Sequence, residues 1–319
     1  MSNGTQGGRS LDASKIEAAY VGFHTTFHNR LQKVTGIHLV VATMVTTTEL
    51  VDRQVWLTNN PKMRRWIGDK VLSKLRAESH PIVTAPHEAS IEVPKHDILN
   101  DRLGLYGGRI SSMAEAYGWA LDELAVSFLA AGIAGSALGT TYDGQNLIDT
   151  DHTALSVGGT SQSNLANGAF DDGVYEDALE KLYSIVDENG VPVNVAGKRL
   201  KLIHGPANAV AVNTVLVQTT LANGESNRNA GTADPVMTPW LAARTVIVNG
   251  VTVTITGTEW FLTFDGSTAL IIHIKRTPEF LSVEEGDYAF MTGKYKYGIE
   301  AEFGAAYGLW QEIVGGDGN

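Results

Sequence analysis

The segment TTYDGQNLIDTDHT, residues 140–153, is the part of the chain most suggestive of chemistry. It holds three carboxylates and one imidazole within ten residues: Asp143, Asp149, Asp151 and His152. Together they could bind a metal ion and activate water for hydrolysis. An EF-hand is excluded, because a loop starting at Asp143 places Leu147 and Ala154 where oxygen ligands are needed. Since Asp-Gly and Asp-Thr-Asp are also common in turns and caps, a structural role is favoured, with a metal-dependent hydrolase as the alternative.

A second candidate pair is His24 and His28, separated by four residues as zinc ligands on a helix often are. No glutamate stands between them, as the HExxH arrangement requires. Phe23 and Phe27 flank the pair, which favours an amphipathic helix that docks on another surface. We therefore interpret Phe23 and Phe27 as contacts with another subunit.

No other signature of catalysis is present. The chain has no cysteine, which excludes disulfides, a thiolate nucleophile, thiolate zinc sites and iron–sulfur clusters. It also lacks a GxSxG elbow, a GxxxxGK[ST] loop and a GxGxxG turn. The sequence thus predicts no cofactor and no bound metal, and it favours a structural or binding role over an enzyme.

Charge is distributed unevenly along the 319 residues, whose formal net charge is -11. Residues 1–110 carry 14 basic and 10 acidic side chains, a net of +4, whereas residues 111–319 carry a net of -15. Such a chain could attract copies of itself, although uneven charge on a solvated surface is the simpler interpretation. The acidic total argues against a dedicated nucleic-acid binder, and no apolar run is long enough to span a membrane.

Two helices are predicted in the first half. Apolar residues recur every three or four positions from about Asp12 to Lys33 and end at Gly36. The stronger pattern runs from Arg109 to Gly132 and predicts a helix of about 23 residues, roughly 34 Å long. A helix of about twice the usual length should form a spine for the fold.

Between these helices, residues 44–99 form an excursion of strand, short helix and returning strand, broken by prolines. Its weak apolar periodicity means that it cannot bury much against itself, so we expect it to lie on something else. Seven basic residues and one acidic residue lie between Arg53 and Arg76, so this part could meet an acidic neighbour or a phosphate backbone, or form a solvated helix face. The side chains expected at an interface are Trp56, Arg64, Arg65, Trp66 and Lys70.

A second, mixed region begins near Thr140. Asp171 and Asp172 are expected to cap a helix that ends at Asn189-Gly190, followed by a strand at 198–205 and a helix at 206–220. Two hairpins are predicted, one turning at Asn249-Gly250 and one at Asp265-Gly266. Alternating apolar residues from Tyr295 to Phe303 predict a closing strand with one buried face.

Four segments resemble a known family when taken together. They are VWLTNNPKMRRWIGDK, LGLYGGRISSMAEAYGWALDEL, YDGQNLIDTDH and KYKYGIEAEFGAAYGLWQ. In this order and at these separations they resemble the Mu-like phage major head subunit family. The match extends from about Phe23 to Gln311, and residues 155–280 match by element order rather than by motif. The chain departs from the expected pattern at Leu147, Ile148 and Thr153, where aromatic residues and a proline are expected.

This resemblance implies an α+β fold, the shell fold shared by tailed-phage capsid proteins and encapsulins. It implies an N-terminal arm and helix (residues 1–43), an extended loop (44–99) and a peripheral domain with the spine helix (100–140). An axial domain (141–279) and a return to the peripheral domain (280–319) would follow.

The function implied is that of a major capsid protein in an icosahedral head shell. Its partners would be itself, as hexamers and pentamers, together with a portal and possible scaffold or decoration proteins. The shell would enclose double-stranded DNA without sequence-specific binding, and the protein would pass from the host cytoplasm into the virion. An encapsulin-like compartment or a gene-transfer particle of the same fold remains the alternative.

Overall fold

The structure is a computed structural model of the 319-residue chain. It describes residues 6–49, 51–58, 76–100, 104–133, 135, 138–153, 161–186, 190–193, 197–221, 223–283 and 287–318, and the side chains of 6–13 and 51–81 are left out of the description. The chain forms two compact units. Unit 1 comprises Met1–Gly36, Thr84–Leu121 and Ile274–Phe303, and unit 2 comprises Ile37–Val83, Asp122–His273 and Gly304–Asn319.

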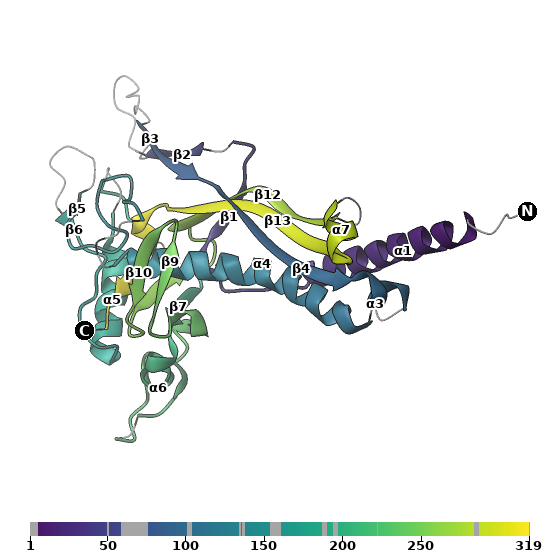
Figure 1. Ribbon diagram of the computed structural model, residues 1–319. Helices are drawn as coiled ribbons and strands as arrows, with labels where there is room; N and C mark the ends of the chain where they lie inside the picture. The colour runs from purple at the N-terminus through teal and green to yellow at the C-terminus, as the bar shows by residue number, and fades with distance from the viewer. Residues whose placement is uncertain are drawn as a thin grey trace, which may run out of the picture. The chain divides into compact units, whose positions relative to one another are not determined.

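Unit 1 is built from long antiparallel strands and helices. Strand β4 (Ala85–Pro94) pairs with β13 (Lys294–Tyr307), and β12 (Leu270–Val283) lies on the other side of β13 (Figure 1). Helices α1 (Gln6–Leu31), α3 (Lys95–Leu99) and α7 (Asp287–Thr292) and the first part of α4 (Gly104–Ala131) complete the unit.

The sequence pattern of the closing strand is confirmed. Along β13 every second side chain from Tyr295 to Phe303 is buried, and the register runs from Lys294 opposite Pro94 to Phe303 opposite Ala85. The spine is also confirmed as α4, a single helix of 28 residues that begins five residues before the expected start. At 1.5 Å per residue it is about 42 Å long.

Unit 2 holds a four-stranded sheet with the order β14-β11-β7-β8. Its strands are β14 (Val314–Gly316), β11 (Trp260–Phe264), β7 (Leu200–His204) and β8 (Ala233–Met237). Strands β7 and β8 are parallel, and β11 is antiparallel to both of its neighbours. All five side chains of β11 are buried, so this strand is covered on both faces.

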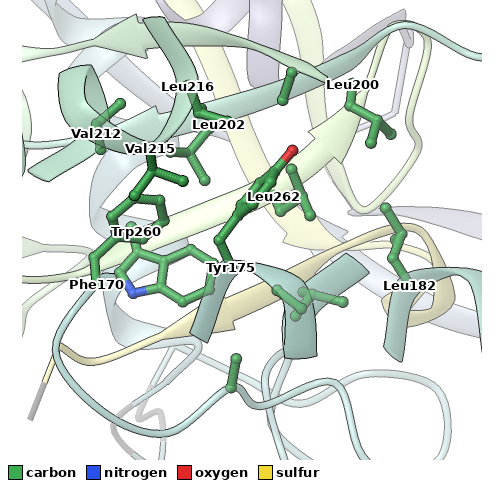
Figure 2. Close-up of a cluster of buried hydrophobic side chains, with 14 of the residues drawn as sticks. Phe170, Tyr175, Leu182, Leu200, Leu202, Val212, Val215, Leu216, Trp260 and Leu262 are labelled. Carbon is green, nitrogen blue, oxygen red and sulfur yellow. The ribbon is translucent and has the colours of Figure 1, made fainter. Parts of the chain in front are cut away.

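The core of unit 2 lies between this sheet and α5 (Asp172–Ser184). Figure 2 shows Tyr175 of α5 beside Leu262 of β11, with Phe170 and Trp260 beyond them. The Asp171 side chain caps α5 by accepting a hydrogen bond from the N–H of Val174, as predicted. A helical segment also packs against this core. It consists of the 3₁₀ helix η1 (Pro206–Asn208), the α-helix α6 (Ala209–Val212) and the π-helix η2 (Asn213–Val217).

One of the two predicted hairpins is confirmed. Strands β9 (Arg244–Val248) and β10 (Val251–Ile255) pair antiparallel, and both turn residues have positive φ, 52° at Asn249 and 78° at Gly250. These angles match the type I′ turn that Asn-Gly favours.

The other predicted hairpin is wrong. Asp265-Gly266 does turn the chain, but β11 pairs with β7 and β14, whereas β12 belongs to a different sheet. Both edges of β11 are already paired, one with β7 and one with β14, so neither edge is left for β12.

Two further boundaries differ from expectation. Helix α5 ends at Ser184 rather than at Asn189-Gly190, since Ile185 is already extended. Residues 37–57 are rich in Val, Thr and Ile, a composition that predicts extended structure, but they contain a short helix, α2 (His38–Val41), before β1 (Thr43–Thr46). The His38 N–H and ring nitrogen both bind the buried carboxylate of Asp122, which fixes this turn of helix. Within the described residues no helix is both long and apolar enough to cross a membrane.

The buried core and the exposed hairpin of unit 2 give a matched stability test. We expect Leu262→Ala, at a fully buried position of β11, to lower the free energy of unfolding by about 2–5 kcal/mol. Ile247→Ala, at a β9 side chain that is 75% exposed, should change it by less than about 0.5 kcal/mol. Urea denaturation followed by circular dichroism measures both, and equal losses would contradict the assigned core.

Candidate functional site

The acidic segment forms a polar turn, residues 141–152, in unit 2. Asp143 and His152 are both fully buried, and the carboxylate binds the His152 Nδ1 at 2.8 Å. The imidazole stacks on Trp310 with ring centroids 4.0 Å apart and planes 5° apart. Asp143 also accepts hydrogen bonds from the Thr141 hydroxyl and the Gln145 N–H. The carboxylate is therefore used to fold its own loop.

The other two carboxylates of the turn make hydrogen bonds of their own. Asp149 accepts hydrogen bonds from the Asn146 side chain at 3.1 Å and the Thr150 N–H at 2.7 Å. Asp151 is exposed, and its pKa is raised because Asp149 favours its protonated form. Among the described residues no group of three or more histidines, aspartates or glutamates could hold a metal ion. The structure thus brings the four predicted ligands together as two pairs rather than as one site.

Electrostatics in the turn support a folding role. Burial by itself raises the pKa of Asp143, but the hydrogen bonds from His152 and Thr141 outweigh burial and lower the pKa overall. A carboxylate held ionised in this way stabilises the folded loop at neutral pH.

The residue that ties the turn to the rest of unit 2 is Asn164, which sequence reasoning missed. Its fully buried amide accepts a hydrogen bond from the Asp149 N–H at 2.8 Å. The Nδ2 group faces the carbonyl oxygens of Leu147, Trp310 and Ile313 at 2.8, 3.2 and 3.1 Å. Asn164 therefore joins three segments that are far apart in the sequence. An asparagine in the polar stretch SQSNLANG is typical of a turn, so no pattern marks it as special.

Phe23 and Phe27, predicted as contacts with another subunit, lie inside unit 1. They are 3% and 0% exposed. Phe23 meets Tyr297 edge to face at 5.1 Å, and Phe27 packs on Phe280 at 5.5 Å. Their observed packing is within the chain, and a contact with another copy stays a prediction.

The interface residues predicted in the excursion lie mostly outside the described residues. Trp56 is on β2 (Val51–Thr58), where its backbone pairs with Glu78, but its side chain is not described. The positions not described at all are Arg64, Arg65, Trp66 and Lys70. Their contacts with a neighbouring copy stay predictions.

Within the excursion, the strands β2 and β3 (Arg76–Val83) form a two-stranded ribbon. The two strands pair antiparallel along their whole length, from Val51 opposite Val83 to Thr58 opposite Arg76. Within the described part of the chain they form a sheet of two strands and join no other sheet. At the base Ile82 is buried against Ile271 and Ala306. The ribbon is thus anchored at one end, and among the described residues no further strand pairs with either of its edges.

Comparison with known proteins identifies the family. The family described as "Mu-like prophage major head subunit gpT" matches residues 16–175, about half of the chain. This stretch includes most of α1, the ribbon, α4 and the polar turn. The chain belongs to this family. Its members are structural capsid proteins rather than enzymes, in agreement with the expectation that this chain is not a hydrolase.

Two curated proteins are similar to the chain. The Mu-like prophage FluMu major head subunit of Haemophilus influenzae is 32% identical over 153 residues, 48% of each chain. The major capsid protein of Escherichia phage Mu is 23% identical over 151 residues, 47% of this chain and 48% of that protein. The matched stretch spans about half the length of these curated relatives.

Comparison with solved structures shows that the similarity in fold covers nearly the whole chain. The chain resembles a protein of the procapsid of bacteriophage JBD30 over 94% of its own length and 74% of that chain, with a TM-score of 0.53 and 22% identity. The chain therefore has the α+β shell fold of tailed-phage capsid proteins, as the sequence resemblance implied.

Asn164 provides the sharpest test of the polar turn. Asn164→Ala should lower the free energy of unfolding by at least about 3 kcal/mol, because a buried N–H and three carbonyls lose a partner. Asn164→Asp should cost more, since it directs a carboxylate at three carbonyl oxygens. Chemical denaturation measures both. As a matched control, Asn223→Ala in an exposed loop should cost less than about 0.5 kcal/mol, and a similar loss at Asn223 and Asn164 would contradict the assigned role.

Asp143 should make stability depend on pH. Its folded-state pKa is lowered, so its contribution is present above the unfolded value near 3.9 and is lost as pH falls through the folded value. Asp143→Asn should therefore destabilise the chain by about 1–3 kcal/mol at pH 7 and by progressively less as pH falls below about 4. Denaturation of both proteins across this range measures the gap, and an unchanged gap would refute the assignment. Asp151→Asn is the control, and it should not destabilise at pH 7, because the pKa of Asp151 is shifted upward.

Proposed function

We propose that this chain is the major capsid subunit of a Mu-like phage or prophage, and that many copies of it form the closed head shell around double-stranded DNA. Membership of the major head subunit family and the shell fold along nearly the whole chain support this proposal. The single observation that carries it in physical terms is the ribbon β2–β3, which finds no partner strand among the described residues of its own chain.

The ribbon needs a neighbour for energetic reasons. An isolated two-stranded hairpin is marginally stable in water, and its two edges present unpaired N–H and C=O groups. Packing on another copy would cover these groups. A shell of identical subunits held by heterologous contacts offers such a neighbour to every copy. Each contact can be modest, because closure makes the contacts mutually reinforcing.

The predicted domain map remains part of the proposal, with one refinement. Residues 1–43 would form the arm, 100–140 the peripheral domain, 141–279 the axial domain and 280–319 the return. Of the proposed loop at 44–99, the part that would reach a neighbour includes the two ribbon strands, residues 51–58 and 76–83. Residues 85–99 are β4 and α3, and β4 is paired along its whole length with β13.

The proposed partners follow from assembly. Copies would gather as hexamers and pentamers, with a portal and with scaffold or decoration proteins, after synthesis in the host cytoplasm. The excess of basic residues in 1–110 and of acidic residues in 111–319 would attract one copy to another. The net charge of -11 would keep binding to the enclosed DNA weak and independent of sequence.

Removal of the ribbon tests the proposal. The purified wild-type chain should form closed particles visible by negative-stain electron microscopy. Replacement of Arg53–Pro81 by Asn-Gly joins Asp52 to Ile82, which already face each other across the ribbon, and keeps the buried Ile82. We expect this variant to fold and to form no closed particles.

Two controls make the result decisive. Circular dichroism and thermal unfolding of the ribbon variant report whether its core is intact, and Asn223→Ala should assemble like the wild type. Closed particles from the ribbon variant would contradict the role of the ribbon. A wild-type chain that stays monomeric under all conditions would contradict the shell function itself. Nucleic acid extracted from particles made in the natural host distinguishes a phage head from a storage compartment, and its sequence content distinguishes a phage head from a gene-transfer particle.

A further inference from the structure

A pair of histidines on α1 lies outside the polar turn and has no role in the proposed assembly. His24 and His28 are one turn apart on the same face of the helix, and both are half-buried. Their Nε2 atoms are 3.1 Å apart, whereas the ring centroids are 4.3 Å apart. Because the nitrogens are closer than the ring centres, the two rings converge on one point at the helix surface.

The separation of the two nitrogens is that of ligands sharing one metal ion. With metal–nitrogen bonds of about 2.0–2.1 Å, the two ligating nitrogens are roughly 2.9 Å apart when the N–metal–N angle is 90°. At a tetrahedral angle they are roughly 3.3 Å apart. The observed 3.1 Å falls between these values. In the metal-free chain the same separation allows one N–H···N hydrogen bond, whose proton a metal ion would replace.

Aromatic neighbours hold the two rings in place. Phe280 meets the ring of His24 edge to face at 6.1 Å, and Phe27 meets that of His28 at 5.3 Å. Tyr20 lies 5.7 Å from His24. Restricting the ring orientations before binding reduces the entropy that a metal must overcome. Among the described residues no third histidine or carboxylate completes a metal-binding group, so the other coordination positions would be open to water.

We propose that His24 and His28 form a two-histidine clamp for a divalent transition-metal ion of the Zn²⁺, Ni²⁺ and Cu²⁺ class. Imidazole nitrogen suits these ions, whereas Mg²⁺ and Ca²⁺ require oxygen ligands. The clamp exists only while residues 24–28 are helical, so the metal stabilises this part of α1 and its packing on Phe280. The proposal is independent of assembly and applies to the single chain.

Calorimetric titration of the tag-free chain with Zn²⁺ tests the clamp. We expect one Zn²⁺ per chain, and binding at least tenfold weaker in His28→Gln, which keeps a good helix former at this position. The chain has nine histidines, so a matched control is needed. His96→Gln removes an exposed histidine of α3, whose Nε2 faces Asn100, and should leave Zn²⁺ binding unchanged.

Thermal unfolding gives a second, independent readout. Zn²⁺ should raise the unfolding temperature of the wild type and of His96→Gln, but not that of His28→Gln or His24→Gln. Circular dichroism shows whether each variant is folded, and the two clamp variants guard against failure of one of them. A wild type that binds no Zn²⁺, or clamp variants that bind it as tightly as the wild type, would overturn the proposal.

Discussion

A single buried amide holds unit 2 together at the place where its segments meet. The side-chain oxygen of Asn164 accepts a hydrogen bond from a backbone N–H of the polar turn. Its Nδ2 group donates to backbone carbonyls of that turn and of residues 310–313. A side chain with both donors and an acceptor is required, because the groups that it faces are of both kinds. The ring of His152, which binds Asp143, stacks on Trp310, so the turn also packs against the closing segment.

Much of the fold could be predicted because its signals are local. Alternation along β13, the Asn249-Gly250 turn and the Asp171 cap each depend on a few adjacent residues and a simple geometric rule. The Asp265-Gly266 hairpin failed because strand pairing is decided by distant partners. Strand β11 is flanked by β7 and β14, which lie about 60 and 50 residues away in the sequence. The short helix α2 was missed for a similar reason, since it depends on Asp122.

Only part of the candidate site could be predicted from the sequence. The acidic segment stood out by composition, and its interpretation as a structural turn agrees with the hydrogen bonds of Asp143 and Asp149. Asn164 could not be found, because what distinguishes it is the convergence of three segments and not its neighbours in the chain. The weak apolar periodicity of residues 44–99 predicted an excursion that cannot bury much against itself. Among the described residues of this excursion, β2 and β3 pair only with each other, whereas β4 pairs with β13 and adds Val93 to the core of unit 1. The burial of Phe23 and Phe27 shows that an apolar helix face can be covered by the chain itself.

The place of β14 in its sheet has a consequence for synthesis. Residues 314–316 supply the outer neighbour of β11, and the same stretch provides the carbonyl that binds the N–H of Ala166. A ribosome must therefore release nearly all of these 319 residues before the sheet can close. Folding of this unit is consequently delayed until residues 314–316 have been synthesised, since its contacts join segments far apart in the chain. Fragments left by translation that stops before residue 314 would lack β14, and one edge of β11 would stay unpaired in them.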